Sequence, residues 1–159
     1  MRNSSIVIGI ILSILFFIAG YITYTDFFEW TLPVVDNVHY LVTALNEHFR
    51  HAIVYSIAVG FIPTTITLTW NIGGIVSIRK RFFSALSIIV CICFAGFTRY
   101  LMILNLAKKS GEPGTEYQYG IPLSKVNIET YVLIGLFIGA IIAFLLFRQG
   151  KNKASELSF

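Results

Sequence analysis

The residues best suited to chemistry are ionisable side chains at the ends of, or inside, long apolar stretches. They lie at three places. Glu47, Arg50 and His51 open one stretch, Arg99 lies inside the next, and Glu129 opens a third. An ionisable side chain inside a membrane is costly unless it is paired, so such residues usually face the interior of a helical bundle. Guanidinium groups suit phosphate and carboxylate partners, and this set therefore predicts either an ion-pair network or a site for a charged ligand.

The composition places these residues in a membrane protein. Of the 159 residues, 56% are hydrophobic and 13% are charged, and the mean hydropathy is +0.76. A soluble domain carries about 25% charged residues. A hydrocarbon core of about 30 Å needs roughly 20 apolar residues per helix. Because four stretches meet that need, we predict an all-α membrane protein, a four-transmembrane-helix bundle that forms a single domain over residues 1–159, with spans of about 6–25, 52–76, 82–106 and 130–147.

The distribution of charge predicts how the chain is oriented. Basic residues gather beside the two ends of the chain and in the short turn at 79–81, whereas the acidic residues other than Glu156 gather on the opposite side. By the positive-inside rule both termini are cytoplasmic, in a bacterial inner (plasma) membrane. The first span has a basic start at Arg2 and no A-x-A-like cleavage site, which predicts a retained signal anchor. The net charge of +4 then indicates contact with anionic lipid rather than with nucleic acid.

The alternating direction of the spans brings the ionisable residues to one depth. Arg99 lies about 17 residues into the third span, or roughly 25 Å from the cytoplasmic turn at 1.5 Å per residue, and Glu47 and Glu129 open the second and fourth spans. Gly96 lies on the same helix face as Arg99, and a glycine there permits close approach. We expect an outward-facing polar pocket, in which Glu47 and Glu129 oppose Arg50 and Arg99 and hydroxyl groups complete the network. Its predicted ligand-binding residues are Glu47, Arg50, His51, Tyr55, Arg99, Tyr100 and Glu129.

Each part of this pocket has a simpler interpretation. Arg99 can extend to the outer interface without a protein partner, Glu47 and Arg50 can form a surface pair, and Glu129 can serve only the dipole of its helix. A charge network that only sets the register of the bundle fits the sequence as well as a ligand site does.

Other classes of site lack support in the sequence. Glu47, His48 and His51 could supply metal ligands, but His48 and Glu47 point to different faces and no second cluster completes a ligand shell. We find no nucleophile with a recognisable base. Cys91 and Cys93 are two residues apart on a helix and therefore point in different directions. No catalytic residue, metal or cofactor is predicted.

The outer loops and the last span carry weaker patterns. Apolar residues at helical spacing predict a short amphipathic helix over about 34–46, in the first outer loop. Tyr119 and Ile121 alternate with other residues, which indicates a short extended piece or a hairpin. Gly135 and Gly139 form a G-x-x-x-G motif, a close-packing surface that we expect to serve the bundle rather than a dimer.

Three segments together resemble a family of small bacterial four-span membrane proteins of unknown function. They are NEHFRHAIVYSIAVGF, RKRFFSALSIIVCICFAGFTRYLMILNLAKKSGEP and IETYVLIGLFIGAI, and they cover roughly residues 45–140. The resemblance implies that Glu47, Arg50, Arg99 and Glu129 are the polar positions of that family. The chain departs from the pattern in having Phe97-Thr98 between Gly96 and Arg99, and Tyr55-Ser56 in place of glycines.

Three functions follow as hypotheses. The first is a non-enzymatic bundle whose polar pocket holds a membrane lipid headgroup or a small amphiphile. The second is an accessory or assembly subunit of a larger membrane complex, with membrane-protein partners or further copies of the chain. The third is a small membrane enzyme or redox helper that acts on a quinone-like or lipid substrate.

Overall fold

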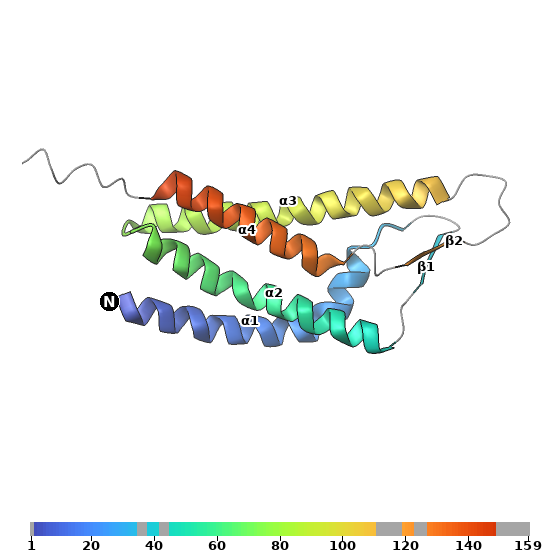
Figure 1. Ribbon diagram of the computed structural model, residues 1–159, viewed down its shortest axis with the longest axis horizontal. Helices are drawn as coiled ribbons and strands as arrows, with labels where there is room; N and C mark the ends of the chain where they lie inside the picture. The colour runs from blue at the N-terminus through green and yellow to red at the C-terminus, as the bar shows by residue number, and fades with distance from the viewer. Residues whose placement is uncertain (1, 35–37, 42–44, 111–118, 123–126, 149–159) are drawn as a thin grey trace, which may run out of the picture.

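The computed structural model describes residues 2–34, 38–41, 45–110, 119–122 and 127–148, with side chains at 6–34, 48–109 and 127–148. These residues contain four long helices (Figure 1): α1 (Arg2–Trp30), α2 (Leu45–Ile72), α3 (Ile78–Ser110) and α4 (Ile128–Phe147). Each helix is long and apolar enough to cross a membrane. The prediction of a four-span helical membrane protein is confirmed, and the helices extend beyond several of the predicted span limits.

The helices pack in the order α1, α2, α4, α3. α1 lies along α2, α3 lies along α4, and α2 and α4 meet between the two pairs. In the most apolar stretch of α2, 44% of the residues are buried, against 11% in that of α1. α2 is therefore central, and α1 lies at one edge with most of its surface exposed.

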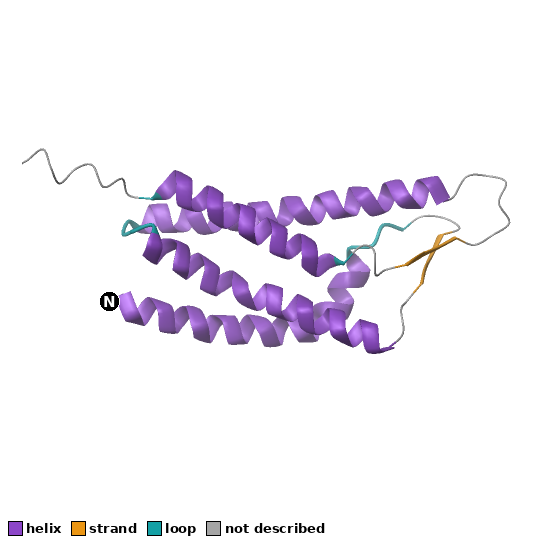
Figure 2. Ribbon diagram, viewed as in Figure 1, coloured by secondary structure: helices purple, strands orange, loops and turns teal. Residues whose placement is uncertain are grey.

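The two ends of the bundle differ in character. The first residues of α1, the turn between α2 and α3 and the end of α4 lie at the left in Figure 1. We call this the basic end, because the exposed residues Arg79, Lys80 and Arg148 lie there. The opposite end carries two short strands (Figure 2) and is called the strand end.

The two strands correct one expectation. β1 (Val38–Leu41) pairs in parallel with β2 (Tyr119–Pro122), and Val38 lies opposite Tyr119. The predicted helix over 34–46 is therefore wrong for Val38–Leu41, while 35–37 and 42–44 lie outside the described residues. A short apolar run fits a strand as well as a helix. The pairing of β1 with β2 provides hydrogen-bond partners for backbone groups of both segments. The extended piece expected around Tyr119 is confirmed.

Glycines in α4 set its contact with α3. A Cβ atom placed on Gly135 would lie 2.6 Å from the Cα atom of Ile92, and one on Gly139 would lie 2.8 Å from the Cα atom of Ile88. The G-x-x-x-G motif thus packs within the bundle, as expected. Gly96 on α3 is different, because a Cβ atom there meets no atom of the other described elements within 4 Å. Among these elements, the expected close approach at Gly96 is therefore wrong.

Gly135 and Gly96 form a matched pair for mutagenesis. Gly135→Ala pushes a methyl group into the backbone of α3, and we expect it to lower the free energy of unfolding by about 1–3 kcal/mol, as overpacking does. Gly96→Ala has open space, and we expect it to raise that free energy by up to about 1 kcal/mol, the helix preference of alanine over glycine. Unfolding in mixed detergent micelles measures both variants. Equal effects of the two substitutions would contradict the packing described.

Candidate functional site

A hydrogen-bonded pair joins α2 to α4 at the strand end. His51 lies in the second turn of α2 and Glu129 in the first turn of α4, and 2.6 Å separates His51 Nδ1 from Glu129 Oε1. The two residues are 8% and 4% exposed. When Glu129 is ionised its carboxylate can only accept, and the Nδ1–H of His51 is then the donor. The position of Glu129 also places its negative charge near the positive end of the α4 dipole.

Arg99 is buried in the contact between α3 and the end of α1. It is 1% exposed. Its Nη1 donates to Thr31 Oγ1 at 2.9 Å and lies 3.5 Å from the Thr31 carbonyl oxygen. Its Cζ atom lies 5.4 Å from the centroid of the Phe28 ring, within the range of a cation–π contact. This burial contradicts the simpler interpretation in which Arg99 extends to the interface without a protein partner.

Tyr24 of α1 packs beside both groups. It belongs to one buried cluster with Phe28, whose ring Arg99 contacts, and with Ile128, the residue before Glu129. Its ring centroid lies 5.4 Å from that of Tyr55 and 5.7 Å from that of Phe28. We therefore treat His51, Arg99 and Glu129 as one unit, the buried polar cluster, with an aromatic wall of Tyr24, Phe28 and Tyr55.

The predicted pocket residues divide between this cluster and the surface. His51, Tyr55, Arg99 and Glu129 are buried inside the bundle. Arg50 is exposed and Tyr100 is 37% exposed, because neighbouring residues on a helix point about 100° apart. The side chain of Glu47 lies outside the described residues. The hydroxyl of Tyr131 lies outside the cluster and donates to Met102 Sδ at 3.1 Å.

Among the described ion pairs, Glu129 bonds to His51, which the expected network did not pair with it. The contacts of Arg99 include Thr31 and Phe28, and the expected pairing of Glu47 stays a prediction. The sequence reasoning missed the contribution of α1, yet a signal was present. Tyr24, Phe28 and Thr31 recur at i, i+4 and i+7, which places them on one helix face.

His51 and Glu129 each leave one polar atom open. These atoms, Nε2 and Oε2, are buried, and neither has a hydrogen-bond partner in the described part of the chain. A buried polar atom without a partner calls for an explanation. The open carboxylate oxygen can accept from a hydroxyl or ammonium group, and the open imidazole nitrogen can accept when neutral or donate when protonated. Within the described ranges, no three His, Cys, Asp or Glu residues converge as metal ligands.

Comparisons with models of known protein families, with curated proteins and with solved structures give no match. The resemblance to four-span bacterial proteins of unknown function therefore stays a prediction.

A double-mutant cycle tests the pair. His51→Phe or Glu129→Leu alone leaves one polar partner buried, and we expect each to cost about 3–5 kcal/mol of unfolding free energy. The double variant replaces the pair with apolar groups, so its cost should be clearly less than the sum. Unfolding in mixed micelles provides the three values.

Arg50→Leu is the control for this cycle. Arg50 belongs to the same turn of α2 as His51 but is exposed, so its replacement should change stability by about 0.5 kcal/mol or less. Strict additivity of the His51 and Glu129 substitutions would show that the pair is not coupled.

Proposed function

We propose that this chain is a non-enzymatic, multi-pass membrane protein whose buried polar cluster binds the headgroup of a lipid or another small amphiphile. It resides in a bacterial inner membrane with both termini in the cytoplasm, so that the cluster faces outward. The proposal follows from the open atoms of the cluster, its depth and its surroundings.

The open atoms of His51 and Glu129 carry the proposal. A cluster that only sets the register of a bundle has its polar groups satisfied, because an unsatisfied buried group costs about 1–3 kcal/mol. A ligand that supplies both a donor and an acceptor completes both residues. Headgroups with a phosphate beside a hydroxyl or ammonium group have this combination.

The depth of the cluster suits an amphiphile. α4 has 20 residues, which at 1.5 Å per residue span about 30 Å, the thickness of the hydrocarbon core. Glu129, in the first turn of α4, then lies at the boundary between acyl chains and headgroups. The aromatic wall of Tyr24, Phe28 and Tyr55 supplies apolar surface beside the polar atoms.

A second candidate is an accessory subunit of a membrane complex. α3 exposes Thr98, Asn105 and Lys109 along a hollow of ≈ 440 Å³ that Leu101, Met102 and Leu106 complete. Polar side chains on the outside of a membrane helix form hydrogen bonds to neighbouring helices. This stripe fits a helix of another subunit.

Lipid retention tests the leading proposal. In nanodiscs of equal phosphatidylethanolamine and phosphatidylglycerol, native mass spectrometry of the released protein should show one lipid that survives activation. Glu129→Gln removes the charge of the acceptor with little change of shape, and retention should fall roughly tenfold, as the loss of a hydrogen bond to a charged group implies. Arg50→Gln, the exposed control, should retain lipid as the unmodified protein does.

Equal retention by both variants would overturn the proposal and leave the cluster a structural one. A stoichiometric protein partner that is lost with Asn105→Leu, but kept with Glu129→Gln, would favour the accessory subunit.

A further inference from the structure

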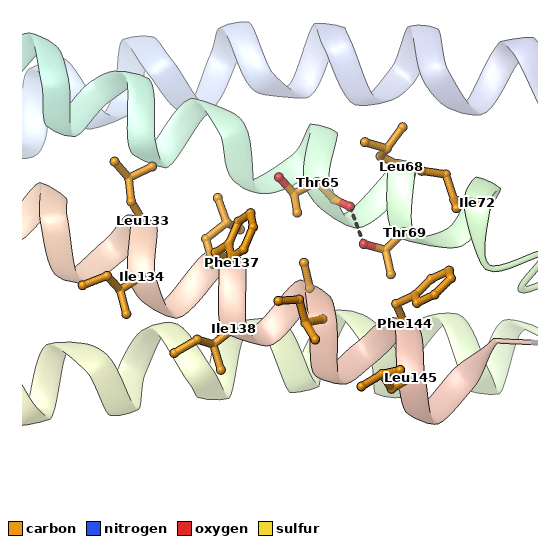
Figure 3. Close-up of a pocket in the computed structure, with 13 residues that line it drawn as sticks. Thr65, Leu68, Thr69, Ile72, Leu133, Ile134, Phe137, Ile138, Phe144 and Leu145 are labelled. Carbon is orange, nitrogen blue, oxygen red and sulfur yellow. Dashed lines mark hydrogen bonds between the residues drawn. The ribbon is translucent and has the colours of Figure 1, made fainter.

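An open groove runs between α2 and α4 toward the basic end of the bundle (Figure 3). Its volume is ≈ 860 Å³, within the range of ligand pockets, roughly 300–1,000 Å³. Its floor includes the buried residues Thr69 and Leu136. The hydroxyl of Thr69 is already bonded to the Thr65 carbonyl at 2.8 Å, so the groove presents an apolar surface. Its rims are exposed large side chains, among them Leu68, Ile72, Leu133, Phe137, Ile141 and Leu145.

The length of the groove matches one leaflet. Its lining on α4 runs from Leu133 to Leu145, a rise of about 18 Å at 1.5 Å per residue. Half of a hydrocarbon core is about 15 Å. The groove therefore has the length of one acyl chain, and it ends where α4 ends.

A cationic side chain lies at the end of the groove where the headgroup of such a lipid would lie. Arg148 is the first residue after α4, and its Cζ atom lies 5.9 Å from the ring centroid of Phe144, which lines the groove. Arg148 is exposed, as are Arg79 and Lys80 at the same end. Arg81 is engaged elsewhere, because its Nε donates to the Ile75 carbonyl and its guanidinium lies over the Trp70 ring.

The lining favours a chain over a helix. Membrane helices approach each other through small residues that let their backbones come close. Of the residues that line the groove, Ala140 is the smallest, and most of the others are Leu, Ile or Phe. A flexible acyl chain fits between such side chains, whereas a second helix would be held away by them.

We propose that the α2–α4 groove holds one acyl chain of an anionic phospholipid from the leaflet at the basic end, with the lipid phosphate paired to Arg148. This site lies at the opposite end from the buried polar cluster and does not depend on the proposed function.

Lipid titration tests the proposal on the full chain. Dioleoylphosphatidylglycerol or dioleoylphosphatidylcholine is added to the detergent-solubilised protein, and native mass spectrometry gives the affinity of the first bound lipid. Arg148→Gln should weaken phosphatidylglycerol about fivefold, which corresponds to roughly 1 kcal/mol per basic residue near an anionic surface. It should weaken phosphatidylcholine less, because the choline cation offsets the charge of the phosphate. Ala140→Phe, which fills the groove, should weaken both lipids.

Two controls separate this site from others. Lys80→Gln removes an equal charge at the same end but outside the groove, and should change the affinity less than twofold. Glu129→Gln removes the other proposed lipid site, at the strand end. In that background Arg148→Gln should weaken phosphatidylglycerol by the same factor, so failure of either proposal is visible without the other.

The proposal is overturned if Lys80→Gln and Arg148→Gln weaken phosphatidylglycerol equally, because general surface charge then explains binding. It is also overturned if the protein is a dimer that Ala140→Phe converts to a monomer, because a second copy then covers the groove. Arg148 is exposed, so its variant gives a result even if Ala140→Phe does not fold.

Discussion

Charged side chains buried at the strand end must be neutralised within the protein, and the arrangement of the helices there depends on how this is done. Glycine contacts and small side chains hold α3 to α4, and α1 lies along α2. At the strand end, the bond from His51 to Glu129 ties one pair to the other, and Arg99 ties α3 to the residue after α1. Because an unpaired charge in this setting is costly, the polar contacts determine which helix faces meet.

α2 and α4 pack differently at the two ends of the bundle. At the strand end, α2 and α4 are joined by a polar bond and covered by rings from α1. Toward the basic end they part into a groove with apolar rims, while Ile88, Leu136 and Ala143 close the contact with α3 beneath. A membrane supplies hydrocarbon to cover such rims, so exposed apolar surface here is not a defect as it would be in water.

The buried polar cluster contains open polar atoms, and helix packing alone does not require them. A bond of 2.6 Å between His51 and Glu129 satisfies one atom of each residue. The second atom of each stays buried without a partner among the residues described. A structural pair alone would be more stable with these atoms satisfied or replaced by apolar groups, and the proposed ligand rests on this observation.

Composition and hydropathy were enough to predict four spans, because helix length against bilayer thickness is a local property of the chain. Span length and direction also placed His51, Arg99 and Glu129 at one depth, since the rise per residue is constant. The rotation of each helix about its axis could not be predicted from the sequence, because packing against neighbouring helices sets it. That rotation buries His51 and exposes Arg50, gives Glu129 a histidine partner, and brings Thr31 to Arg99. It also distinguishes Gly135, where a Cβ atom would meet the backbone of α3, from Gly96, where it would meet no atom of the other described elements within 4 Å. The strand at Val38–Leu41 also depends on tertiary structure. Its partner, Tyr119–Pro122, lies 81 positions along the chain, so no local sequence pattern could predict the pairing.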